Sequence, residues 1–168
     1  APEQFEARVR AMPAEGFAGA NVTIPHKAAA LALADAPTEV AKEIGAANTL
    51  VFAAGRIQAH NTDARGLLAA LPGTPLDARA LVLGAGGAAR AVVWALVGEG
   101  ARVEVWNRTG GRAESLCAQL GGKAVAAPSQ AEYDLIVNTS SAGLGGGDPF
   151  AELPLVPGGF AAGQLVVD

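Results

Sequence analysis

Residues 81–90 read Leu-Val-Leu-Gly-Ala-Gly-Gly-Ala-Ala-Arg, a short apolar run that leads through a glycine-rich turn into an apolar-periodic helix. Gly84, Gly86 and Ala89 fit the G-x-G-x-x-G/A spacing of a dinucleotide-binding turn. Gly84 allows a tight turn, Gly86 lets a pyrophosphate approach the backbone, and Ala89 lets the helix pack close to the sheet. The helix N-terminus offers N–H groups and a partial positive charge to an anion.

The residues around this turn predict alternating strands and helices. We expect strands at 80–83, 102–106, 123–126, 135–138 and 165–168, and helices at 88–97 and 112–120. Such alternation is typical of a parallel sheet with right-handed crossovers. The second half of the chain is therefore predicted to be a Rossmann-type α/β domain.

The first half predicts a smaller α/β unit. Its expected elements are a helix over 3–12 ended by Pro13, a strand over 20–24, a helix from Pro25 to about residue 33, a helix over 38–44 capped by Gly45, a hairpin of 49–53 with 56–60, and a helix after residues 61–63. The short, turn-rich segment 74–77 is the expected boundary. We therefore predict two domains, residues 1–73 and 78–168.

Composition narrows the class of protein. A net charge of −4 argues against a nucleic-acid or anionic-membrane partner, and no apolar run is long enough for a membrane span. Cys117 is the only cysteine, which excludes an intrachain disulfide and favours a reducing, cytoplasmic compartment. We expect no bound metal and a monomer or homodimer. Because the chain starts without Met and ends in an apolar run, we expect a piece of a longer protein.

The end of the second predicted strand indicates which dinucleotide is bound. An NAD site places an acidic residue there, whereas this chain has Asn107, Arg108 and Thr109, with Arg112 three residues later. Guanidinium groups and a hydroxyl would accept a 2′-phosphate, so we predict NADP(H). The alternative is that both arginines only solvate the start of a helix, where their charge opposes the helix dipole.

Three upstream motifs place polar side chains at the ends of predicted strands: Asn-Val-Thr-Ile-Pro-His-Lys at 21–27, Gly-Ala-Ala-Asn-Thr at 45–49 and Asn-Thr-Asp at 61–63. Followed by Gly-Ala-Gly-Gly-Ala at 84–88 and Asn-Arg-Thr-x-x-Arg at 107–112, this series resembles the shikimate dehydrogenase family. The resemblance implies NADPH-dependent reduction of 3-dehydroshikimate to shikimate in aromatic amino-acid biosynthesis. It makes the first domain a partial substrate-binding domain.

The resemblance also implies roles for individual residues. Lys27 and Asp63 would be the catalytic pair, with Thr23, Asn48 and Asp63 binding substrate hydroxyls. The pyrophosphate would lie on Gly84, Ala85, Gly86, Gly87 and Ala88, the adenosine phosphate on Asn107, Arg108, Thr109 and Arg112, and the nicotinamide near Thr139 and Ser140. A lysine ammonium can protonate the alkoxide that develops when a ketone accepts hydride, and a carboxylate can orient that lysine.

Each of these residues also has a purely structural interpretation. Lys27 could be a solvated helix residue, Asp63 a helix N-cap, and Thr23 and Asn48 simple strand-end hydrogen bonders. Cys117, Trp94 and Trp106 are expected to pack in the core. No role is predicted for His26 or His60.

Alternative functions also remain open. An acidic residue within 107–112 would favour a quinate/shikimate dehydrogenase with relaxed cofactor use. An acidic residue at the same strand end would also favour a methyltransferase. Loss of Lys27 or Asp63 would favour a non-catalytic NADP sensor. The family also has an N-terminal Ser-x-Ser segment for the substrate carboxylate and later tyrosine and glutamine ligands. The chain lacks these, which again predicts a longer protein.

Overall fold

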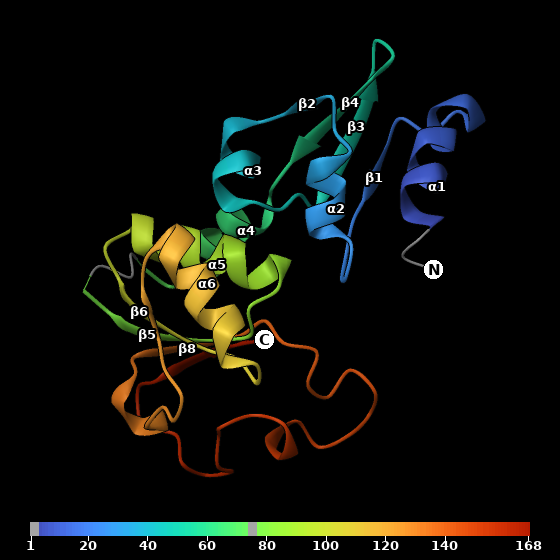
Figure 1. Cartoon of the computed structure of the whole chain (residues 1–168). Helices are drawn as coiled ribbons and strands as arrows, with labels where there is room; N and C mark the ends of the chain where they lie inside the picture. The colour runs from blue at the N-terminus through green and yellow to red at the C-terminus, as the bar shows by residue number, and fades with distance from the viewer. Residues whose placement is uncertain (1–3, 74–76) are drawn as a thin grey trace.

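The computed structural model describes residues 4–73 and 77–168, so most of the predicted boundary at 74–77 lies outside the described residues (Figure 1). Two sheets organise the chain. The first has four strands in the order β1-β3-β4-β2, and the second has five in the order β7-β6-β5-β8-β9. Within the described ranges, no helix is long and apolar enough to cross a membrane.

The first half of the chain builds the four-stranded sheet and the helices around it. The β3–β4 hairpin has the predicted bounds, with Thr49 opposite His60, and β1 and β2 flank it in antiparallel and parallel pairing respectively. The elements are α1 (Phe5–Ala11), η2 (Met12–Glu15), β1 (Gly19–Asn21), α2 (Lys27–Ala32), β2 (Ala36–Pro37), α3 (Glu39–Ile44), β3 (Thr49–Ala53), β4 (Arg56–His60) and α4 (Asp63–Ala70).

Some predicted bounds in this half differ from the structure. The α-helix α1 ends at Ala11, before Pro13 as predicted, and Pro13 lies in the first turn of the 3₁₀ helix η2, where its missing N–H costs no helical hydrogen bond. The strand predicted over 20–24 is β1, which ends at Asn21. The helix α2 begins at Lys27 rather than at Pro25, since Pro25 lies in a turn closed by the N–H of His26 donating to the Thr23 carbonyl. The Thr38 hydroxyl caps α3 and Gly45 ends it at φ +74°, as predicted.

The second half forms the predicted parallel sheet, in which all neighbouring strands pair in parallel. Its strand order, 3-2-1-4-5 in chain sequence, is that of a Rossmann-type half. After β7 the connections carry the 3₁₀ helices η3 and η4 rather than α-helices. The elements are β5 (Arg79–Leu83), α5 (Gly87–Gly98), β6 (Arg102–Trp106), α6 (Gly110–Leu120), β7 (Lys123–Ala124), η3 (Gln130–Glu132), β8 (Leu135–Asn138), η4 (Pro149–Ala151) and β9 (Leu165–Val167).

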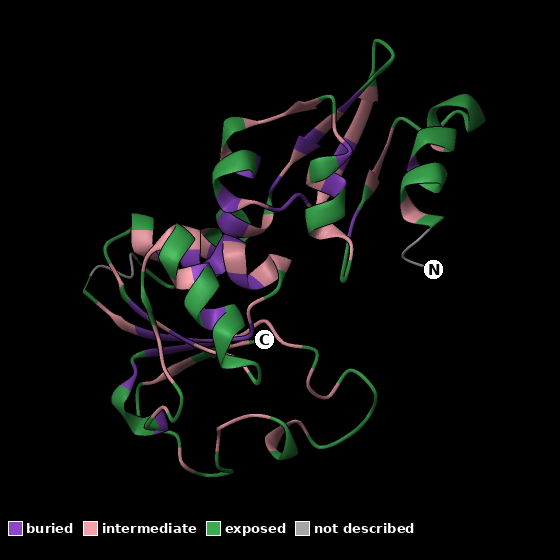
Figure 2. Ribbon diagram, in the orientation of Figure 1, coloured by how far each residue is buried: buried purple, intermediate pink, exposed green. Residues whose placement is uncertain are grey.

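Strand alternation divides the core of this sheet into two layers. On β5, Ala80 and Val82 pack with the apolar sides of α5 and α6, whereas Leu81 and Leu83 pack on the opposite face with Tyr133. Figure 2 shows the buried residues concentrated on these strands and on the inner side of α5. The carboxyl ends of β5, β6 and β8 are thereby held in one rigid edge.

The two sheets are joined through α5. Small side chains, Ala64 on α4 and Ala91 and Ala95 on α5, allow these helices to pack closely beside buried Ile44. Arg90 extends from α5 to donate a hydrogen bond to the Ile44 carbonyl at the end of α3. The helix α5, which begins at the glycine turn, therefore also contacts the elements that follow the upstream motifs.

Candidate functional site

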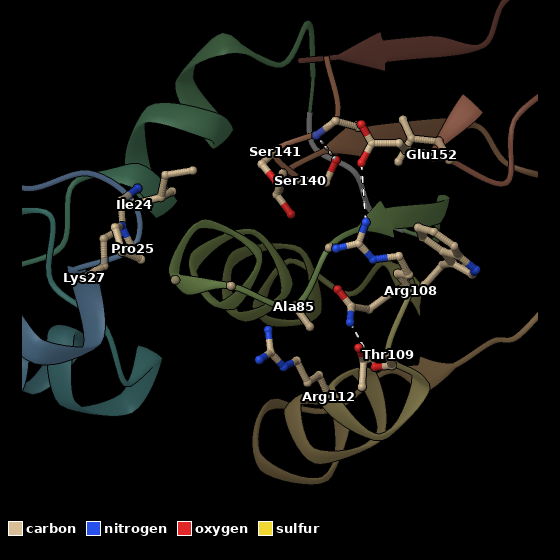
Figure 3. Close-up of a pocket in the computed structure, with 18 residues that line it drawn as sticks. Ile24, Pro25, Lys27, Ala85, Arg108, Thr109, Arg112, Ser140, Ser141 and Glu152 are labelled. Carbon is tan, nitrogen blue, oxygen red and sulfur yellow. Dashed lines mark hydrogen bonds and ion pairs between the residues drawn. The ribbon is translucent and has the colours of Figure 1, made fainter. Parts of the chain in front are cut away.

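A cleft of about 360 Å³ opens at the carboxyl edge of the five-stranded sheet (Figure 3). It lies where strand order reverses, between β5 and β8, the position at which open α/β sheets bind ligands. Its walls combine residues from both halves of the chain. They include Ile24, Pro25, Lys27, Gly84, Ala85, Gly86, Gly87, Trp106, Asn107, Arg108, Thr109, Arg112, Thr139, Ser140, Ser141, Ala142, Glu152 and Leu153.

The glycine turn, residues 84–88, meets the steric requirements of a pyrophosphate. Gly84 has φ +115°, and a Cβ there would lie 2.7 Å from the Thr139 hydroxyl oxygen. Gly86 is exposed, and a Cβ on it would meet nothing within 4 Å, so its backbone faces open space in the cleft. With α5 beginning at Gly87, the backbone N–H groups of its first turn are available to an anion. Ala88 lies in that first turn but outside the cleft lining.

Thr139 and Ser140 follow β8 and form the wall opposite the glycine turn. The Thr139 hydroxyl donates to the Leu83 carbonyl at 2.8 Å, which ties this wall to the end of β5. The Ser140 hydroxyl and N–H both donate to the Asn138 side-chain oxygen, at 2.7 and 3.0 Å. Both predicted residues therefore lie in the cleft as expected.

Lys27, Asn48 and Asp63 are far apart in sequence but meet in one polar network. The Lys27 ammonium donates to the Asp63 carboxylate at 2.7 Å, and the Asn48 amide donates to the other carboxylate oxygen, also at 2.7 Å. The Lys27 and Asp63 side chains are only 13% and 28% exposed. Lys27 also lines the cleft, so it connects this network to the dinucleotide turn.

Backbone contacts fix the orientation of that network. The Asn48 side-chain oxygen accepts from the Thr62 N–H at 2.9 Å, which directs the Asn48 amide nitrogen toward Asp63. Asp63 is the first residue of α4 and does not cap it. The Asn61 side chain accepts from the Asp63 N–H at 3.0 Å instead, which corrects the N-cap reading. The Asp63 carboxylate thus faces Lys27 and Asn48.

Thr23 is exposed and lies two residues before Pro25. Its backbone carbonyl accepts a hydrogen bond from the His26 N–H. Its hydroxyl makes no hydrogen bond with the described residues. The structure therefore brings Lys27, Asn48 and Asp63 together, and it leaves the Thr23 side chain exposed to solvent outside this network.

The predicted 2′-phosphate residues lie at the end of β6, as expected. The Asn107 amide donates to the Thr109 carbonyl at 2.9 Å, which shapes the turn before α6. The Arg108 and Arg112 side chains are exposed and both line the cleft, on the side of the glycine turn opposite Lys27 (Figure 3). Two cations thus stand within reach of one anionic group.

Sequence reasoning missed Glu152, which brings a carboxylate to this part of the cleft. Its oxygen lies 3.5 Å from the Arg108 guanidinium, 44 residues away in the chain. Residues 107–112 contain no acid, so the carboxylate beside Arg108 comes from a distant part of the chain. No signal near Arg108 could reveal Glu152, because the long β8–β9 connection alone decides where η4 lies.

Other singled-out side chains are structural. Cys117 packs against the core, where burial raises the pKa of its thiol. Trp94 packs where α5 meets the first half of the chain, and its indole N–H donates to Glu43. Trp106 packs on the face of the five-stranded sheet opposite α5 and also lines the cleft. His26 stacks on Phe5 with ring centroids 4.4 Å apart.

Comparison with known proteins agrees with this geometry. Two family models match, the shikimate dehydrogenase substrate binding domain over residues 1–50 and shikimate / quinate 5-dehydrogenase over residues 69–142. The shikimate dehydrogenase (NADP(+)) of Acidiphilium cryptum is 45% identical over all of this chain, which covers 62% of that relative.

Solved structures give the same result. Shikimate dehydrogenase from Aquifex aeolicus superposes with a TM-score of 0.88 at 37% identity, covering 99% of this chain and 63% of that one. The Thermus thermophilus enzyme, solved with NADP(H) and shikimate, has a TM-score of 0.76 at 45% identity over 84% of this chain and 55% of that one. The chain thus spans about three-fifths of the length of these relatives. On both domain models and on fold, the chain belongs to the shikimate dehydrogenase family.

Proposed function

We propose that this chain is the catalytic and cofactor-binding part of an NADP-dependent shikimate dehydrogenase, which interconverts 3-dehydroshikimate and shikimate. One observation carries the proposal: Lys27 lines the dinucleotide cleft and also donates to the Asp63 carboxylate at 2.7 Å. A proton donor and a dinucleotide turn on one cleft are the two requirements for reducing a ketone. The division into residues 1–73 and 78–168 is part of the proposal.

The residues of this chain divide the reaction between them. When bound, NADPH supplies the hydride that turns the carbonyl carbon into a secondary alcohol. The Lys27 ammonium donates the proton to the carbonyl oxygen and stabilises the charge that develops there. Asp63 orients Lys27, while Asn48, Asp63 and the free hydroxyl of Thr23 bind the substrate ring hydroxyls.

The glycine turn holds the pyrophosphate, and the residues after β6 hold the 2′-phosphate. The open face of Gly86 and the N-terminus of α5 fit an anion in contact with the backbone. Arg108 and Arg112 supply charge for a phosphate, and Thr139 and Ser140 wall the nicotinamide side. A cytoplasmic location belongs to the same proposal, supported by the lone thiol Cys117.

The test uses the full-length protein and follows absorbance at the nicotinamide band. Shikimate with NADP⁺ should give a rapid increase, while exchanging NADP⁺ for NAD⁺ or shikimate for quinate should give a much slower one. No turnover of shikimate despite NADPH binding would contradict the proposal and support a non-catalytic sensor.

A quinate/shikimate dehydrogenase with relaxed cofactor use is the second candidate, and Glu152 favours it. A carboxylate near the adenosine ribose suits NAD, whose 2′-hydroxyl donates a hydrogen bond. Comparable rates with NAD⁺ and NADP⁺, or with quinate and shikimate, would establish this candidate.

A further inference from the structure

Gly87 lies in the turn assigned to the pyrophosphate, but the spacing of that turn does not explain why position 87 is a glycine. Gly84, Gly86 and Ala89 occupy the restricted positions of the G-x-G-x-x-A spacing, and Gly87 falls on an unrestricted one. Its φ is not in the left-handed region, and as the first residue of α5 it is a poorer helix former than alanine. Neither the cofactor motif nor the backbone therefore requires glycine here.

The neighbour of Gly87 supplies a reason. A Cβ built on Gly87 would lie 2.7 Å from the Cβ of Lys27, 3.2 Å from its Cδ and 3.4 Å from its Cγ. The stem of Lys27 thus lies along the bare Cα of Gly87. Because the closest atom is the Lys27 Cβ, rotation about the side-chain bonds cannot relieve this contact.

The Lys27 backbone is held in place as well. Lys27 begins α2, and its carbonyl accepts from the Ala47 N–H at 2.9 Å. At its other end, the ammonium is held by Asp63. A side chain at position 87 would therefore displace α2 from the glycine turn or pull the ammonium away from the carboxylate.

We propose that Gly87 is a positioning residue for Lys27: its missing side chain lets the lysine stem pack on the dinucleotide turn and sets the ammonium against both Asp63 and the cleft. The inference rests on the proposed role of Lys27. The contact between Lys27 and Gly87 fixes the position of the proton donor relative to the turn that would hold the hydride donor. A displacement of about 1 Å in such a site can cost on the order of 100-fold in rate.

Three glycine-to-alanine variants of the full-length protein test this. Gly87→Ala should lower kcat by about 10- to 100-fold and change the pH profile of kcat, with a smaller effect on the Kd for NADPH, measured by fluorescence titration. Gly86→Ala should show the reverse, a weaker Kd with a smaller effect on kcat, because its Cβ would enter the open face of the cleft. Gly98→Ala, at the far end of α5 with nothing within 4 Å, is the matched control and should alter neither.

A second measurement does not depend on activity. Gly87→Ala should lower the thermal midpoint of the apo-protein, and this loss should vanish in a Lys27→Gly background, where the clashing Cβ is absent. If Gly87→Ala does not fold, the double variant should fold.

Two results would overturn the inference: an unchanged kcat for Gly87→Ala, or a loss of stability that is the same in both backgrounds. Failure of the proposed function is distinguishable, because the unsubstituted protein would then not turn over shikimate, or Lys27→Ala would keep its kcat, while the stability coupling between positions 27 and 87 persists.

Discussion

Glu152, the residue after η4, faces Arg108, which follows the end of β6, with 3.5 Å between the carboxylate and guanidinium groups. The Arg108 side chain is 82% exposed, so solvent screens this pair. A 2′-phosphate binding beside Arg108 must displace Glu152 or tolerate its charge. We therefore expect cofactor preference to depend also on a residue outside the strand-end motif.

Replacing Glu152 by glutamine should tighten NADPH binding by about two- to fivefold, the range for exposed charge pairs, and leave NADH nearly unchanged. Titration of both cofactors at low salt measures this, and the gain should shrink at high salt. Glu99→Gln, which removes the same charge at the far end of α5, should have no effect. An equal gain for NADH would show that Glu152 acts on something other than the 2′-phosphate.

Arg108→Ala should weaken NADPH by about ten- to 150-fold and NADH much less, because a charge-assisted bond to the 2′-phosphate is lost. The comparison is made by Kd for each cofactor. Arg102→Ala, at the opposite end of β6, is the matched control. Equal losses for the two cofactors would remove Arg108 from 2′-phosphate recognition.

Lys27→Ala in the full-length protein should lower kcat by about 10²- to 10⁴-fold, the range for loss of an acid or base, with NADPH affinity nearly unchanged. Steady-state kinetics with saturating cofactor measures the change. Lys42→Ala on α3, an exposed lysine paired with Glu39, controls for loss of a charge. A variant that retained most of its kcat would show that Lys27 is not the proton donor.

Arg90→Ala should reduce the free energy of unfolding by about 1–3 kcal/mol, because the Ile44 carbonyl loses its donor at the junction of the two sheets. Burial lowers the pKa of Arg90, which shows that its guanidinium is partly removed from water. Urea unfolding measures the loss. Arg65→Ala, exposed on α4, should cost little, and a similar cost for both variants would contradict the junction role.

Cys117 should react with iodoacetamide more slowly than an unfolded cysteine at pH 8, because burial raises its pKa and leaves less thiolate. Because the folded protein keeps the thiol protonated to a higher pH than the unfolded chain does, the free energy of unfolding has its full contribution from this group below the unfolded pKa of about 8.5. That contribution is lost as the pH rises through the folded pKa. Mass spectrometry of the peptide that contains Cys117 follows the labelling. Equal rates in the folded and urea-unfolded protein would contradict burial.

The elements of the second half could be predicted from local sequence because their information is local. Continuous apolar runs specify β5 and β8, period-two alternation specifies β6, and the turn at 84–88 needs glycine for reasons that one strand and one helix explain. Errors fell where a turn competes with a helix start, as at Pro25, or where two residues such as Ala36 and Pro37 become a strand only by pairing with β4.

The Rossmann-type sheet, the dinucleotide turn and the residue types of the site could be predicted from the sequence, because they depend on the spacing and side-chain chemistry of neighbouring residues. Only the tertiary structure decided that Lys27, Asn48 and Asp63 share one network, that Lys27 rests on Gly87, and that Glu152 meets Arg108. These are contacts between segments far apart in sequence. Their geometry depends on how α5 packs against α2 and α4 and on where the β8–β9 connection lies, and no local pattern encodes either.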